Sequence, residues 1–467
     1  MRLTVPEPKI DLYNDGFADH DQLDRKATGD KLSDLVERID DPMVIALDGA
    51  WGSGKSFFLK CWVGEHLKRK ENTTQTVYFD AFEHDFLDDP LIALTGAIAE
   101  RFESAESREE DQKSERSKKI KKAAWAVGKG ALRIGASVAT FGATEALSDM
   151  GDAVANAVGD EARTFLSSDI GNGEAEKFWT AHEARIAAMK AFRIALTELT
   201  EPVTEDQATE DDKLRVGNPT RKLVVVIDEL DRCRPDYALS LLEIIKHFFN
   251  VPGVHFVLGV NLQELQNSVR ARYGSGVDAA KYLQKFVSVE MPLRSTDTSG
   301  FEPSAYLKHF GSVTGKMKIA KHPLNHLVRD YLEMANHHFP ITLRDVEKMC
   351  ALLAVIAHDH LNTKGSQYLL AGLIVLKITA PHLVDAAKRN ELEFKELNQA
   401  FLLDSRIAQG GVWNEARQSW LLATSKDMNK GLRPDDFDAL QPLFNQEDPQ
   451  EVLRLVIAYN LDSFILR

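Results

Sequence analysis

The stretch MVIALDGAWGSGKS, residues 43–56, decides the fold class of this 467-residue chain. Its first five residues are apolar and follow Pro42, which is typical of a short strand buried on both faces. Gly49, Gly52 and Gly54 then allow a tight loop, and the residues after the loop, FFLKCWVGEHLKRK, have the pattern of a helix. The order of strand, glycine-rich loop and helix predicts the first unit of an α/β domain with a parallel sheet.

The glycine-rich loop matches the phosphate-binding pattern G-x-x-x-x-G-K-[ST]. Backbone N–H groups of such a loop surround a phosphate chain, and the N-terminus of the next helix faces the same anion. We expect Lys55 to reach the β- and γ-phosphates and Ser56 to join the Mg²⁺ shell. An incidental glycine turn is the alternative, but the strand before and the helix after favour the phosphate loop. The predicted nucleotide contacts within this segment are Gly49, Ala50, Trp51, Gly52, Ser53, Gly54, Lys55, Ser56 and Phe57.

A second buried strand, LVVVI at residues 223–227, is followed by two acidic residues. In a parallel sheet such a strand delivers a carboxylate beside the phosphate loop, so we expect Asp228 to hold Mg²⁺ directly or through water. A helix N-cap is the alternative role for Asp228. Glu229 is predicted to orient and deprotonate the attacking water, with a structural ion pair as the alternative. Asp80, at the end of the strand TVYF, either fixes this water or has a structural role.

Three further positions are candidates for contact with the phosphates. Arg232, near Asp231 and Arg234, acts as an arginine finger on a neighbouring subunit or forms a local salt bridge with Asp231. Asn261, after the strand HFVLGV, senses the γ-phosphate or simply forms a turn. Arg344 opens a predicted helix, from which it reaches back to the phosphates or lies on the helix surface.

The chain divides into regions of different pattern. We predict an N-terminal arm at 1–22, a discontinuous nucleotide-binding core at 23–102 and 181–295, a charged and helical insertion at 103–180, and a helical domain at 296–467. The predicted fold class is therefore α/β: a P-loop NTPase core with a central, mainly parallel sheet, a helical insertion, and an all-α C-terminal domain.

Composition limits the partners and the location. The formal net charge of −14 argues against a generally basic, DNA-coating surface, so nucleic-acid binding through residues such as Arg270 stays unproven. Three widely spaced cysteines suit a reducing cytoplasm. We find neither a signal peptide nor an apolar run long enough to span a bilayer, and we expect a cytoplasmic location.

The motifs together resemble the KAP family of P-loop NTPases, which belongs to the additional-strand group related to AAA+ and STAND proteins. The resemblance lies in GAWGSGKSFFLK, the strand ending in FDAFEHD, IDELDRCRPD and YLQKFVSVEMPL, and it extends discontinuously over about residues 20–350. Arg344 falls where the family has a helix-opening arginine. Asp228 and Glu229 replace the usual Asp-Asp, while Phe82 and Asn261 stand where Trp and Asp are common.

The resemblance implies a nucleotide-driven switch or assembly factor that associates with itself and with a separate effector or sensor protein. Because bacterial members are tied to conflict with phages and plasmids, it also implies a role in defence. Many members carry transmembrane helices between the two nucleotide motifs, but the insertion here is too polar to span a bilayer. We favour the interpretation that the insertion forms helices that bind a partner protein. The alternatives are contact of residues 118–146 with the inner face of the membrane, or disorder of the insertion.

We therefore expect ATP and Mg²⁺ as ligands and ATP hydrolysis as the activity, because the chain has no guanine-reading N-K-x-D stretch. Two alternatives stay open. One is a scaffold that binds nucleotide without hydrolysing it, and the other is a membrane-peripheral organising NTPase.

Overall fold

The computed structural model describes residues 9–106, 186–202, 217–293, 305–356, 362–404, 411–425 and 440–462, apart from a few positions within these ranges. Most of the predicted insertion at 103–180, including the segment 118–146 that is expected to meet a partner or a membrane, lies outside the described residues. Residues 1–8 of the predicted arm lie outside them as well.

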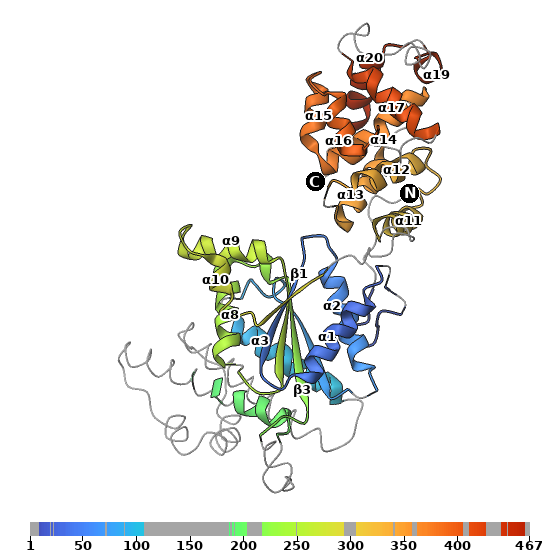
Figure 1. The fold of residues 1–467 in the computed structure, drawn as a ribbon. Coiled ribbons are helices and arrows are strands. Elements are labelled where there is room, and N and C mark those ends of the chain that lie inside the picture. Colours follow the sequence, from blue (N-terminus) through green and yellow to red (C-terminus); the bar gives the residue numbers. More distant parts are fainter. Residues whose placement is uncertain are drawn as a thin grey trace, which may run out of the picture.

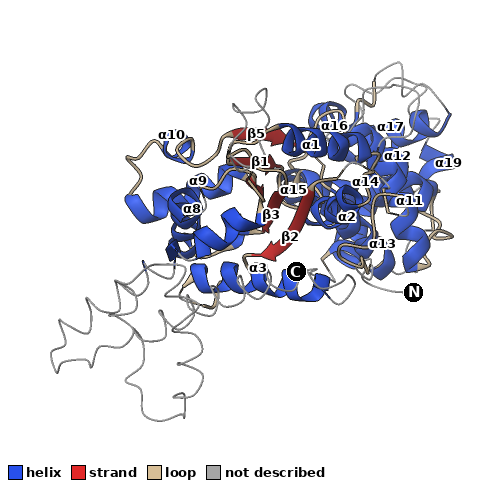
Figure 2. Cartoon of the chain, turned by 90° about the horizontal axis from the view of Figure 1, so that it is seen from below, coloured by secondary structure: helices blue, strands red, loops and turns tan. Residues whose placement is uncertain are grey.

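One parallel sheet forms the centre of the nucleotide-binding part and confirms the α/β fold class. Its strands are β1 (Met43–Asp48), β2 (Thr74–Asp80), β3 (Lys222–Asp228), β4 (Val254–Val260) and β5 (Val289–Pro292). The five strands have the order β2–β3–β4–β1–β5, and all four pairings are parallel. Figure 2 shows the strands side by side. Strand β4 therefore separates β1, which leads into the glycine-rich loop, from β3, which ends at Asp228.

The sequence pattern did not predict β5 as a strand. It has only four residues, lies at one edge of the sheet, and alternates partly buried with exposed positions, as at Glu290. The pattern of a fully buried strand, which identified β1, β3 and β4, is therefore missing.

Helices cover both faces of the sheet (Figure 1). α1 (Lys26–Arg38) and α2 (Lys55–Leu67) pack on one face, against alternate strand residues such as Ile45 and Val226. The other face is covered by α3 (Pro90–Glu106), α8 (Pro235–Phe248), α9 (Leu262–Tyr273) and α10 (Ala279–Leu283). Because successive strand residues point to opposite faces, a wholly apolar strand such as β3 supplies both apolar clusters.

The described residues after β5 contain helices and no strand. These are α11 (Ala305–Met317), α12 (Asn325–Ala335), α13 (Leu343–Val355), α14 (Lys364–Thr379), α15 (Pro381–Lys388), α16 (Phe394–Phe401), α17 (Gly411–Thr424), α19 (Leu440–Phe444), α20 (Pro449–Val456) and a π-helical turn, η5 (Ile457–Leu461). They share one apolar cluster around the buried α14, separate from the two clusters of the sheet. The domain boundary at residue 296 stays a prediction. No described helix is both long and apolar enough to cross a bilayer.

The described part of the predicted arm packs against the core. Phe17 is 2% exposed, and its ring lies 5.4 Å from that of Phe58. The chain passes so close to α2 that a Cβ on Gly64 would lie 1.9 Å from the carbonyl oxygen of Asp15. This approach requires a glycine at position 64.

Candidate nucleotide site

The glycine-rich loop runs from the carboxyl end of β1 to the first residue of α2. Gly52 and Gly54 have φ angles of 80° and 84°, in the left-handed region that glycine adopts without strain. The loop is closed by hydrogen bonds of 3.1 Å from Gly49 N to Val260 O and from Ser53 N to Ala50 O. The motif glycines are thus used for a turn that leads directly into the N-terminus of α2.

Lys55 lies within this loop and is 8% exposed. Its Nζ donates hydrogen bonds to the carbonyl oxygens of Gly49, at 2.5 Å, and Ala50, at 3.3 Å. Burial lowers the pKa of Lys55, and nearby carboxylates led by Asp231 oppose this effect. A cation held by two neutral carbonyls is available to exchange them for phosphate oxygens, which are stronger partners.

Asp228, at the end of β3, is 0% exposed and carries two hydrogen bonds. Its Oδ2 accepts one of 2.7 Å from the hydroxyl of Tyr78, and its Oδ1 accepts one of 2.9 Å from Glu229 N. Burial raises the pKa of Asp228, while donors including Tyr78 and Ser56 act in the opposite direction. Sequence reasoning missed Tyr78. The available signal was its place two residues before the end of a strand that ends, like β3, in aspartate.

Glu229 directly follows and has a φ angle of 58°, which is uncommon for a residue with a side chain. Its Oε1 lies 3.4 Å from Ser56 Oγ, and its Oε2 lies 2.9 Å from Arg232 Nη1. Burial raises the pKa of Glu229, and the guanidinium of Arg232 opposes this. The carboxylate of Glu229 thus lies beside the phosphate loop and also forms a local ion pair with Arg232. These contacts are compatible with both roles that the sequence left open for Glu229, the general base and the structural ion pair.

The oxygen atoms gathered at this edge fit a magnesium ion bound together with phosphates. Ser56 lies in the first turn of α2, Asp228 ends β3, and Glu229 directly follows Asp228. Mg²⁺ prefers oxygen ligands, and it is usually bound by one or two protein groups, with phosphates and waters completing the shell. The described residues contain no group of three or more His, Cys, Asp or Glu side chains able to hold a metal.

The charged cluster after Glu229 is arranged differently from the expectation. Among the described residues, Asp231 pairs with no arginine; its Oδ2 instead accepts a 2.6 Å hydrogen bond from Trp51 Nε1. Arg234 pairs with Asp85, with Nε to Oδ1 at 2.8 Å. Asp231 and Arg234 therefore have partners far away in the sequence, which spacing alone does not reveal.

Two segments outside the motifs donate hydrogen bonds to backbone carbonyl oxygens of the glycine-rich loop. Leu343 N, at the start of α13, donates to Gly52 O at 3.2 Å. Arg344, the next residue, is exposed and lies beside Gly52. A Cβ added to Gly52 would lie 2.7 Å from the Cβ of Arg344. Arg25, which sequence reasoning missed, donates from Nη1 to Ser53 O at 2.7 Å, and burial lowers its pKa to about 10. A lone arginine ahead of a helix gives no signal for this contact.

The remaining candidates have local partners. Asn261 caps α9, and its side chain accepts a 3.1 Å hydrogen bond from Gln263 N. Phe57 is partly buried in the cluster under α1 and α2. The Oδ1 of Asp80 accepts hydrogen bonds of 3.1 Å from the backbone N–H groups two and three residues further along the chain. Roles of Asn261, Phe57 and Asp80 at the nucleotide stay predictions.

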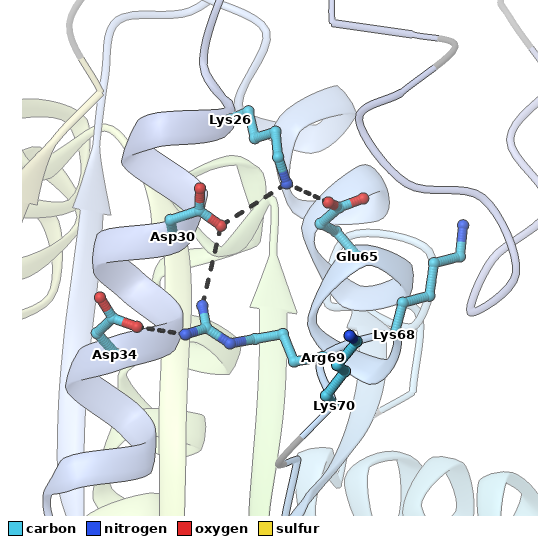
Figure 3. Close-up of a pocket in the computed structure, with 7 residues that line it drawn as sticks. All are labelled: Lys26, Asp30, Asp34, Glu65, Lys68, Arg69 and Lys70. Carbon is cyan, nitrogen blue, oxygen red and sulfur yellow. Dashed lines mark hydrogen bonds and ion pairs between the residues drawn. The ribbon is translucent and has the colours of Figure 1, made fainter.

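A separate polar hollow lies between α1 and α2 (Figure 3). It is lined by Lys26, Asp30, Asp34, Glu65, Lys68, Arg69 and Lys70. Lys26 contacts Glu65 and Asp30, while Arg69 contacts Asp34 and Asp30. These side chains link the two helices across the hollow, and we assign no ligand to it.

Comparison with known proteins identifies the family. The KAP family P-loop domain matches residues 25–359. No curated protein matches the chain. Among solved structures, the Aeropyrum pernix ORC2 protein is similar in its complexes with ADPNP and ADP, with a TM-score of 0.32, 11% identity, and coverage of 94% of this chain and 95% of that one. Its ADP form gives a TM-score of 0.31, 9% identity and coverage of 94% of each chain.

Proposed function

Because the chain belongs to the KAP family of P-loop NTPases, we propose that it is an Mg²⁺-dependent ATPase that works as a nucleotide-driven switch or assembly factor. One observation carries the proposal: Ser56 Oγ lies 3.4 Å from Glu229 Oε1, beside the buried carboxylate of Asp228. The hydroxyl that follows the phosphate loop is thereby close to Asp228, which ends β3, and to Glu229, which follows it. Metal binding and activation of water require groups of this kind next to the phosphates.

The chemistry assigned to these residues is in-line hydrolysis. Lys55 and the N–H groups at the start of α2 would hold the β- and γ-phosphates. Ser56 and Asp228 would hold Mg²⁺, which supplies charge neutralisation on the phosphate oxygens. Glu229 would orient a water and take its proton as the water oxygen bonds to the γ-phosphorus and the bond to the β-phosphate oxygen breaks. ADP and inorganic phosphate are the products.

We further propose a role as a switch, on the basis of the family and of a contact between α13 and the phosphate loop. The family resemblance and the contact between Gly52 and Leu343 at α13 support a switch in which nucleotide state changes the position of the C-terminal helices. We propose self-association, a separate effector or sensor protein, a cytoplasmic location and a defence role against phages or plasmids. Arg344 is a proposed contact to the γ-phosphate, and Asn261 is its proposed sensor. For Arg232, the ion pair with Glu229 of the same chain favours a local role over that of an arginine finger on a neighbouring subunit.

A scaffold that binds nucleotide without turnover is the second candidate. The ion pair between Glu229 Oε2 and Arg232 Nη1, at 2.9 Å, favours it because a paired carboxylate is less free to accept a proton. Steady-state phosphate release separates the two proposals. An ATPase requires turnover by the wild-type chain that falls about 10²- to 10⁴-fold in Glu229→Gln, with binding of a non-hydrolysable ATP analogue retained. Equal, background release by both proteins would favour the scaffold.

A further inference from the structure

Tyr78 connects the edge strand of the sheet to the carboxylate of Asp228. It lies on β2, opposite Val226 in the parallel register, and Asp80 lies opposite Asp228. Since side chains two residues apart on a strand share a face, Tyr78 points to the same face as Asp228. Its hydroxyl donates to Asp228 Oδ2 at 2.7 Å.

Tyr78 is contacted by the N-terminal segment and by α2. Its backbone N donates to the hydroxyl of Tyr13 at 3.0 Å, and Lys60 Nζ of α2 lies 5.5 Å from the ring centre. The hydroxyl therefore reaches Asp228 from a side chain that strand pairing, the N-terminal segment and α2 hold in place.

The carboxylate of Asp228 has more hydrogen-bond acceptor positions than its two hydrogen bonds occupy. Two carboxylate oxygens offer about four acceptor positions. Tyr78 takes one on Oδ2 and Glu229 N takes one on Oδ1, which fixes the plane of the group. The remaining positions are available to the Ser56 hydroxyl and to a metal ion or its water.

We propose that Tyr78 is a positioning residue for the metal site: its hydroxyl sets the orientation in which Asp228 meets a magnesium ion held by Ser56 and the nucleotide. The inference rests on the proposed function, which makes Asp228 a metal-holding residue. Groups that hydrogen-bond to metal-binding side chains orient them, and their loss typically lowers metal affinity about 10- to 100-fold.

Tyr237 provides a matched control. It lies on α8 in the core of the same domain, is 3% exposed, and its hydroxyl has no hydrogen-bond partner within the described structure. Tyr237→Phe and Tyr78→Phe each remove one hydroxyl oxygen atom. Only Tyr78→Phe removes a donor to Asp228.

The test measures binding of Mn²⁺, followed by the EPR signal of the free ion, to the stoichiometric complex of the protein with a non-hydrolysable ATP analogue. We expect Tyr78→Phe to raise the Kd for Mn²⁺ about 10- to 100-fold. Tyr237→Phe should match the wild type, and metal-free affinity for the analogue should stay the same in all three proteins. In an Asp228→Asn background, Tyr78→Phe should have no further effect on Mn²⁺ binding.

The outcomes separate this inference from the proposed function. If the wild-type complex binds Mn²⁺ no better than the free analogue does, the proposed metal site is wrong. If the wild type binds Mn²⁺ tightly and Tyr78→Phe binds it equally well, the positioning role is wrong and the ATPase proposal stands. An equal loss in the Asp228→Asn background would also overturn the inference, because Tyr78 would then not act through Asp228.

Discussion

The indole Nε1 of Trp51 donates a 2.6 Å hydrogen bond to Asp231 Oδ2 and so joins the glycine-rich loop to the segment after β3. Asp231 is 7% exposed, whereas Trp51 is 45% exposed and faces solvent over part of its ring. Arg25 and Leu343 also donate hydrogen bonds to backbone carbonyl oxygens of this loop. The phosphate loop is therefore tied to three segments that lie far from it in sequence, and we expect its shape to depend on them.

Replacing Trp51 by phenylalanine should loosen the loop while keeping an aromatic ring. A hydrogen bond to a charged group contributes about 1.5–3 kcal/mol, so complete loss corresponds to roughly 10-fold or more in affinity if the loop must be ordered to bind. We expect Trp51→Phe to weaken binding of a non-hydrolysable ATP analogue about 10-fold, measured by calorimetry. Asp231→Asn keeps an acceptor and should cause a smaller loss than Asp231→Ala. Wild-type affinity in Trp51→Phe would contradict a role for the hydrogen bond.

The contact between the loop and α13 predicts a steric effect at Gly52. An alanine there would have a strained φ of +80° and would place its Cβ 2.7 Å from Arg344 Cβ and 2.9 Å from Thr342 Oγ1. We expect Gly52→Ala to lower the free energy of unfolding by about 1–3 kcal/mol.

Gly96→Ala, in α3, is the control, because a Cβ there meets no atom within 4 Å. It should stabilise the helix by about 0.5–1 kcal/mol. Denaturant unfolding measures both variants. A Gly52→Ala protein as stable as the wild type would show that α13 does not pack against the loop in solution.

Arg232 lies 2.9 Å from Glu229 of its own chain, and this distance predicts how its removal behaves. Arg232→Ala should lower phosphate release less than about 10-fold, well below the roughly 10³-fold expected for an arginine finger. Mixing Arg232→Ala with Lys55→Ala should not restore turnover. Restoration in the mixture would instead assign Arg232 to the nucleotide of a neighbouring subunit.

His255, on β4, predicts part of the pH dependence of stability. It is 0% exposed, and burial, assisted by Lys222, lowers its pKa to about 4. The unfolded chain binds this proton near pH 6.5 and the folded chain only near pH 4. The proton therefore binds preferentially to the unfolded chain between these pH values, and the free energy of unfolding falls as the pH falls through this range. Between pH 6.5 and 4 it should remove about 3 kcal/mol of stability.

A His255→Leu variant cannot take up this proton. Its free energy of unfolding should therefore fall less steeply than that of the wild type between pH 7 and pH 4 when measured by urea unfolding. Identical slopes for the two proteins would show that His255 is not held neutral in the folded state.

The sequence predicted the parts of the candidate site that are formed by residues adjacent in the chain. Residues 49–56 and the acidic pair after LVVVI are short patterns whose chemistry follows from adjacent residues. Tyr78 and Arg25 were missed because their partners, Asp228 and Ser53, lie 150 and 28 residues away and meet them only through strand pairing and helix packing. The same reason explains why spacing offered an arginine, and not Trp51, as a partner for Asp231.

Binding of MgATP to the phosphate loop is the central claim, and calorimetry with a non-hydrolysable ATP analogue tests it most directly. We predict that the wild type binds the analogue with Mg²⁺ and that Lys55→Ala weakens binding at least about 100-fold, since charge-assisted bonds to phosphate are lost. Lys68→Ala, just after α2, should leave the affinity unchanged. Equal affinity in the wild type and Lys55→Ala, or no binding by folded wild-type protein, would contradict the account.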